Sequence, residues 1–153
     1  MRYAAKIEAP FGFLGIRTEG ACLAGIEFLP SREEPLAPSD AFAEKVCLQL
    51  AAYLADPDFD FDLPLQLHGT EFRKMVWGKI AKIPRGKTRL YGEIAQELSS
   101  APRAVGQACG ANPLPIVIPC HRVVAKTGLG GFMHHGEGDP LLIKKWLLAH
   151  ESD

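Results

Sequence analysis

The sequence predicts an α+β protein of two modules: a small, strand-rich α/β domain over residues 1–66 and a helical domain with a helix-turn-helix over residues 67–153. The first part alternates short strand-like runs with turn residues, whereas the second has apolar residues at helical spacing. The charge divides in the same way. Residues 1–68 hold five basic and eleven acidic residues (−6), and residues 69–153 hold twelve and seven (+5). Such a division is typical of two modules, the second of which faces a polyanion.

Composition excludes several other classes of protein. Hydrophobic residues make up 47% of the 153 and charged residues 23%, which is too apolar for a disordered chain. No apolar run approaches the roughly 18–20 residues that span a bilayer, and the start of the chain lacks the apolar stretch of a signal peptide. We therefore expect a cytoplasmic protein with no membrane partner.

The N-terminal module is expected to be a β-meander followed by one helix. Turn residues around Gly12 and Gly20 separate three strand-like runs, at residues 2–8, 13–18 and 22–28. Ser39 or Asp40 can cap a helix whose apolar residues recur at helical spacing, namely Phe42, Val46, Leu50 and the pair Tyr53/Leu54. The acidic and aromatic stretch 56–62 ends the module as an edge strand or a linker.

The second module begins with a helix that Thr70 caps and that runs through Ile83, before the Pro-Arg-Gly stop at residues 84–86. Two short helices follow, joined by three residues in the outline of a helix-turn-helix, over residues 91–98 and 102–110. The second of these has small residues where a reader of the major groove has long polar ones: Ala104, Gly106, Ala108 and Gly110. Tight packing against a neighbouring helix and close approach to a nucleic-acid backbone both account for them.

After an irregular turn we expect a short buried strand over residues 116–118, interrupted by Pro119 and resumed at Val123-Val124. A glycine-rich loop and a last helix complete the chain, over residues 128–138 and 140–150.

Cys120 differs from the other three cysteines, which are Cys22, Cys47 and Cys109. It follows a proline and precedes His121 and Arg122, and positive charge or a hydrogen-bonded histidine favours the nucleophilic thiolate. From these residues alone it is either a reactive cysteine or a buried structural one. A Cys-His hydrolase that uses a distant residue such as His150 is a further reading. No CxxC pair is present, and Cys120 with His134-His135 matches no common zinc site, so we predict no metal.

Residues 118–123, Ile-Pro-Cys-His-Arg-Val, resemble the active-site motif of the O6-alkylguanine-DNA alkyltransferases, also called methylated-DNA–protein-cysteine methyltransferases. The resemblance runs from Gly69 to Glu151 and includes, in the family's order, Tyr91-Gly92, Arg103-Ala104-Val105-Gly106, Asn112-Pro113 and residues 146–151. The first module fits more weakly, through its strand-rich start and Pro10-Phe11-Gly12.

The resemblance implies a winged-helix-like DNA-binding domain and direct-reversal repair without a cofactor. The alkyl group of O6-alkylguanine in double-stranded DNA would move irreversibly to Cys120, once per protein molecule, after the nucleotide flips out through the minor groove. O4-alkylthymine is a second candidate substrate, and the chemistry needs only a monomer. A non-catalytic binding module of the alkyltransferase-like kind is the alternative, which the presence of the cysteine disfavours.

The resemblance also implies residue roles. Cys120 is the nucleophile, His121 takes its proton through a water, Glu151 orients His121, and Tyr91 donates a proton to the guanine leaving group. Arg103 fills the space of the flipped base. The other expected DNA contacts are Ala104, Gly106, Tyr91 and Arg122, with phosphate-binding candidates Lys74, Arg85, Lys87, Arg89 and Lys126.

Asn112 is expected to brace the turn that carries Cys120. Val123, through its carbonyl, and the side chains of Phe132 and Met133 are expected to form the substrate pocket. Between residues 131 and 140 the sequence departs from the family, because a serine that many members carry there is missing. The zinc ligands that some family members carry have no match in the first module of this sequence.

Overall fold

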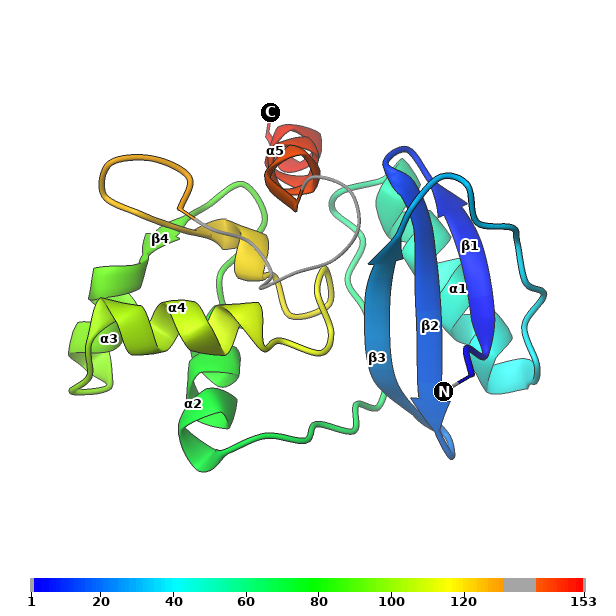
Figure 1. The fold of residues 1–153 in the computed structure, drawn as a ribbon, viewed down its shortest axis with the longest axis horizontal. Coiled ribbons are helices and arrows are strands. Elements are labelled where there is room, and N and C mark those ends of the chain that lie inside the picture. Colours follow the sequence, from blue (N-terminus) through cyan, green and yellow to red (C-terminus); the bar gives the residue numbers. More distant parts are fainter. Residues whose placement is uncertain (1, 131–139, 153) are drawn as a thin grey trace. The chain divides into compact units, whose positions relative to one another are not determined.

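The computed structural model describes residues 2–130 and 140–152, and the chain folds as two units, Met1–Leu67 and His68–Asp153 (Figure 1). The division lies one residue from the expected one. Within the described ranges, no helix is both long enough and apolar enough to cross a membrane.

The first unit contains a three-stranded antiparallel meander in the order β1-β2-β3 (Figure 1). The strands are β1 Ala5–Ala9, β2 Gly12–Glu19 and β3 Cys22–Leu29. The turn before β2 needs a glycine, because Gly12 has a φ of +134° and a Cβ there would collide with the carbonyl oxygen of Leu29. The meander therefore forms where turn residues predict it.

One helix, α1 Ala41–Ala55, packs against β1 and β2. Asp40 is its N-cap, and its Oδ1 accepts a hydrogen bond of 2.8 Å from the backbone N–H of Ala43. The buried face of α1 is Ala43, Val46, Leu50 and Tyr53. The stretch 56–62 contains no strand, so the edge-strand expectation is wrong; it is an irregular segment of the first unit, in which the Asp62 N–H donates to Oε1 of Gln49 at 2.9 Å.

The second unit is mainly helical. Its first helix is α2 Glu71–Ile80, capped by Thr70, whose Oγ1 accepts from the N–H of Arg73 at 3.1 Å. The helix is shorter than predicted, because the residues from 81 to 83 continue as turns before Pro84. The remaining helices are α3 Tyr91–Glu97, α4 Pro102–Gly110 and α5 Pro140–Glu151.

The buried strand predicted over residues 116–118 is wrong. Leu114, Ile116 and Ile118 are buried, but the segment is a turn in which the N–H of Ile118 donates to the Leu114 carbonyl at 2.8 Å. Ile116 has a φ of +78°, a left-handed conformation that a β-branched residue rarely adopts. Three prolines in seven residues, at 113, 115 and 119, remove the donors that a strand ladder needs.

The strand expected to resume at Val123-Val124 is present as β5 Val123–Val124. It pairs in parallel with β4 Arg89–Leu90, which directly precedes α3. This pairing brings the segment after Cys120 beside the start of α3, and so positions the site.

Candidate active site

Cys120 opens a single 3-10 turn, η1 Cys120–Arg122, which Pro119 starts. The N–H of Arg122 donates to the Pro119 carbonyl at 2.9 Å. The thiol faces the protein interior, with 2% of the residue exposed. The cysteine is thus held on a tight turn between a proline and two basic residues.

Asn112 braces that turn as expected and also contacts the sulfur. Its Nδ2 donates to the Ile118 carbonyl at 2.8 Å and to Cys120 Sγ at 3.1 Å, while its Oδ1 accepts from the Leu114 N–H at 2.9 Å. A donor aimed at sulfur stabilises a thiolate more than a thiol. The sequence predicted the bonds to the backbone but not the bond to sulfur.

His121 is fully buried and pairs with Glu151, whose Oε2 lies 2.8 Å from His121 Nε2. A carboxylate only accepts, so Nε2 carries the proton and Nδ1 has the lone pair. Nδ1 has no hydrogen-bond partner among the described residues. Burial lowers the pKa of His121, although the bond to Glu151 opposes this. The imidazole is therefore neutral and can take a proton on Nδ1.

Glu151 is itself fixed by two arginines. Arg122 donates through Nε to Oε1 and through Nη2 to Oε2, both at 2.8 Å, and its Nη1 donates to the Ile83 carbonyl. Arg85 donates to the backbone carbonyl of Glu151 at 2.7 Å. We expected Arg122 and Arg85 at DNA. With 12% of the Arg122 side chain exposed, the geometry favours a role in holding Glu151.

The Cys120 thiol is neutral at rest. Burial raises its pKa well above the ordinary value, and a hydrogen bond with the Cys109 thiol raises it further. The amide of Asn112 and the charge of Lys144 oppose this with smaller effects. The reaction therefore needs a base at the moment of attack, rather than a thiolate formed in advance.

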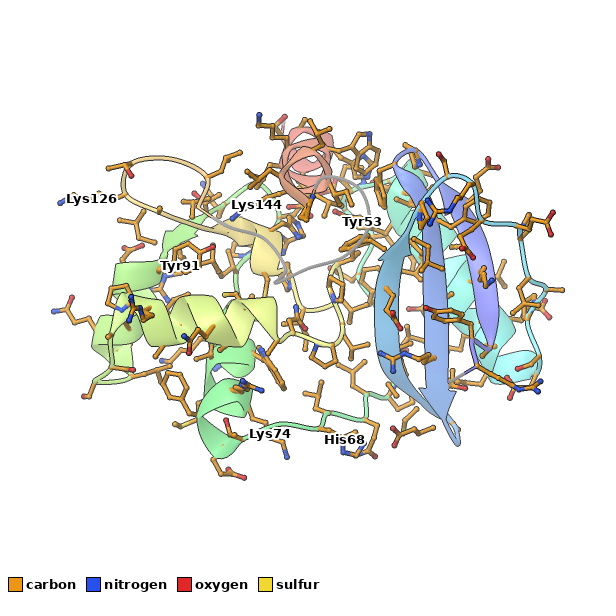
Figure 2. The ribbon with its side chains drawn as sticks, viewed as in Figure 1. Tyr53, His68, Lys74, Tyr91, Lys126 and Lys144 are labelled. Carbon is orange, nitrogen blue, oxygen red and sulfur yellow. The ribbon has the colours of Figure 1, made fainter. Side chains whose placement is uncertain are left out.

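Tyr91 begins α3, and burial raises the pKa of its phenol. Gly130 packs against its ring so closely that a Cβ there would lie 2.7 Å from Tyr91 Cε2. The phenol oxygen is 3.5 Å from Nζ of Lys144 on α5 (Figure 2). We predicted no role for Lys144, although its position on the buried stripe of α5, with Ile143, Leu147 and Glu151, is an unusual one for a lysine.

The residues predicted to enter DNA lie on α4. Arg103 is exposed, and Ala104 and Gly106 are half-buried. A Cβ on Gly106 would meet no atom within 4 Å in the described part of the chain. Packing against the described residues therefore does not require a glycine at this position.

The other predicted residues differ in exposure and in their contacts. Lys74, Lys87 and Lys126 are exposed (Lys74 and Lys126 are labelled in Figure 2), whereas Arg89 pairs with Glu97 at 2.6 Å. The carbonyl of buried Val123 accepts from Lys144 at 2.7 Å. Phe132 and Met133 lie outside the described residues. No cluster of three or more metal-binding side chains occurs in the described ranges.

Comparison with known proteins gives one consistent family. Residues 71–153 match the family model described as 6-O-methylguanine DNA methyltransferase, DNA binding domain. A methylated-DNA–protein-cysteine methyltransferase of Mycobacterium leprae is 39% identical over 135 residues, which cover 84% of this chain and 81% of the relative. Another, of Methanosarcina acetivorans, is 36% identical over 157 residues and 97% of each chain.

Solved structures agree with the sequence relatives. The O6-methylguanine methyltransferase of Mycobacterium tuberculosis superposes with a TM-score of 0.82 at 36% identity, over 98% of this chain and 92% of that one. The protein from the same organism in complex with DNA gives a TM-score of 0.79 at 38% identity, over 95% and 90%.

Proposed function

The chain belongs to the methylated-DNA–protein-cysteine methyltransferases, enzymes of DNA repair, and from this premise we propose that each molecule reacts once, at Cys120. The alkyl group would pass irreversibly from O6 of guanine to the cysteine sulfur. The observation that carries this assignment is the linked set of contacts in which Asn112 bonds the sulfur and Glu151 bonds the adjacent histidine.

In the proposed reaction, Cys120 Sγ attacks the alkyl carbon while its proton passes to Nδ1 of His121, through a water as the family resemblance implies. The S–C bond forms, the C–O6 bond breaks, and its electron pair moves to the guanine. Asn112 Nδ2 stabilises the negative charge that develops on sulfur, since it is already 3.1 Å away. Glu151 stabilises the imidazolium that results.

Guanine leaves poorly as an anion, so we assign Tyr91 as the group that protonates it. The phenol suits this role, because burial keeps it protonated well above neutral pH. The Val123 carbonyl would accept from the guanine amino group, since a carbonyl oxygen has two lone pairs and Lys144 uses one.

For DNA we propose that α3 and α4 act as the helix-turn-helix of a winged-helix-like domain, with α4 in the minor groove. The minor groove is only about 6 Å wide, and the small residues Ala104 and Gly106 allow a helix to approach it. Arg103 would fill the space of the flipped nucleotide and so offset part of the unstacking energy. Readout in this groove is largely blind to sequence, which suits damage at any guanine.

The partner we propose is double-stranded DNA with O6-alkylguanine, and O4-alkylthymine is the second candidate base. One polypeptide carries every assigned group, so we propose a monomer. A free reactive thiol persists in a reducing compartment, which favours the cytoplasm.

The test is intact-mass measurement after incubation with a duplex that contains one O6-methylguanine. We expect one methyl mass per protein molecule, located on Cys120 and absent from Cys120→Ala. Cys22→Ala, Cys47→Ala and Cys109→Ala should still gain it. A non-catalytic binding module would gain no mass, and a hydrolase would turn over without keeping an adduct.

A further inference from the structure

Lys144 is a fully buried lysine to which the mechanism above gives no part. Its Nζ donates to the Val123 carbonyl at 2.7 Å and to the Leu129 carbonyl at 2.6 Å, and lies 3.5 Å from the hydroxyl oxygen of Tyr91 (Figure 2). These partners come from three places: β5, the loop after it and α3. Few lysines are fully buried, and those that are usually pair with a specific group.

The direction of these hydrogen bonds follows from the chemistry of the ammonium group. It has three N–H donors and no acceptor, so the Tyr91 oxygen can only accept from it. Two N–H groups are committed to the carbonyls on either side of the loop 123–129, which fixes Nζ in front of the phenol. The phenol's own hydrogen must then point away from Nζ, where it can be donated to another group.

We propose that Lys144 is the proton source behind Tyr91, which supplies a second proton when Tyr91 protonates the departing guanine. The inference rests on the proposed function, since it requires a guanine leaving group. The Tyr91 O–H proton goes to the guanine, and a proton from Lys144 Nζ goes to the phenolate. Tyr91 ends as a phenol and Lys144 as a neutral amine, so Tyr91 is only the carrier.

The buried position favours this transfer. Burial raises the pKa of Tyr91 and lowers the pKa of Lys144 to about 8, so the phenolate is much the stronger base and the proton moves to it spontaneously. The titratable groups that face Lys144 are Tyr91 from α3, Cys109 from α4, and Cys120 and His121 from η1. Cys109 and Cys120 oppose the lowering of the Lys144 pKa, with smaller effects than that of burial.

The transfer also keeps the total charge of the site constant. As Lys144 loses its proton to the leaving group, His121 gains one from the thiol. The buried positive charge thus moves from Lys144 to His121, where the Glu151 carboxylate lies 2.8 Å from the ring. The buried site gains no net charge, which avoids a large desolvation cost.

The experiment compares two reactions of Cys120 in the same variants. One is single-turnover methyl transfer from a duplex with one O6-methylguanine, and the other is alkylation by iodoacetamide, whose iodide leaves without a proton. We expect Lys144→Met to slow methyl transfer on the order of 10–100-fold and the iodoacetamide reaction less than about threefold. Lys144→Arg should also be slow with DNA, since a guanidinium keeps the charge but cannot release a proton. Lys145→Met, at the exposed neighbour, is the matched control and should react like wild type.

Three results would overturn the proposal. Equal slowing of both reactions would place Lys144 in thiol activation or packing, and wild-type rates in Lys144→Arg would show that charge alone is enough. If Lys144→Met is unfolded at the assay temperature, the pH dependence of the methyl-transfer rate in wild type and in Tyr91→Phe is the test instead. The wild-type rate should fall above about pH 8, where Lys144 loses its proton, and the rate of Tyr91→Phe should not fall there. An identical fall in Tyr91→Phe would refute a relay through the phenol. Absence of any methyl adduct on wild-type Cys120 would instead refute the proposed function.

Discussion

Replacing Glu151 by glutamine is the sharpest test of how Cys120 is activated, because it removes a charge and changes little else. The carboxylate is 1% exposed and contacts His121 through one oxygen and Arg122 through both. Glutamine keeps the size, but one of its two terminal atoms becomes an NH₂ donor. That donor must face either an arginine N–H or the His121 ring.

The first expected effect is on stability. Removing one partner of a buried ion pair costs about 3–5 kcal/mol. The Arg122 side chain keeps 12% exposure and its bond to the Ile83 carbonyl, so we expect the lower end of that range, about 3 kcal/mol. For a chain of this size, that corresponds to a fall in Tm of roughly 6–12 °C by calorimetry. The affinity for DNA should stay within about twofold of wild type, because Glu151 has no contact with DNA in our assignment.

The second effect is on the rate of methyl transfer at neutral pH. An NH₂ group beside Nε2 favours the tautomer with the proton on Nδ1, which leaves no lone pair to take the thiol proton. Loss of a general base costs about 10²–10⁴-fold. The rate should recover partly as the pH rises toward the raised pKa of Cys120, where the thiol ionises without help. The recovery should be fuller with iodoacetamide than with DNA, since Lys144 loses its proton above about pH 8.

The result that would refute this reasoning is additivity. If Glu151 acts only through His121, the pair Glu151→Gln/His121→Gln should be little slower than the worse single variant. Losses in log rate that add in full would mean two independent roles. A rate that is independent of pH in Glu151→Gln would equally contradict base catalysis, because it would leave no trace of an ionising thiol.

Three further predictions test the remaining assignments. Cys120→Ala should lose methyl transfer yet keep its affinity for duplex DNA, and transfer that survives at one methyl per protein would place the nucleophile elsewhere. Arg103→Ala should slow repair of duplex DNA at least about tenfold more than reaction with the free modified base, which needs no extrusion; equal slowing would remove Arg103 from flipping. Affinity for DNA should fall steeply with salt, with a slope near −0.9 for each phosphate neutralised, and binding titrations that show no salt dependence would contradict a role for the exposed lysines Lys74, Lys87 and Lys126.

The helices were predictable because local residues specify them. Asp40 and Thr70 accept the capping bonds that their residue types suggest, and Pro102 stands at the start of α4. The strand over residues 116–118 was not predictable from its apolar run, because burial and strand pairing are separate properties. Ile116 is 3% exposed yet left-handed, in a turn that closes with a backbone bond over four residues.

Contacts between residues that are distant in sequence were harder to predict than the helices. The pairing of His121 with Glu151 spans 30 residues, and only the family resemblance predicted it. The sequence predicts Arg122 as a DNA contact but not its bonds to Glu151, because a basic residue beside a nucleophile gives no sign of a carboxylate 29 residues away. The bond from Asn112 to sulfur was missed since asparagine beside proline is also an ordinary turn signal.

The contacts of Lys144 could not be predicted from the sequence. Lys144 lies on the buried stripe of α5, and helical periodicity alone predicts an apolar contact of its long side chain at such a position. Its chemistry depends on three oxygen atoms that sequence places 15, 21 and 53 residues away. A lysine so enclosed is costly to keep charged, and the two carbonyls recover only part of that cost. A group that is held charged against burial gives up its proton readily, and the Tyr91 oxygen, 3.5 Å from Nζ, can take that proton once the phenol has protonated the leaving group.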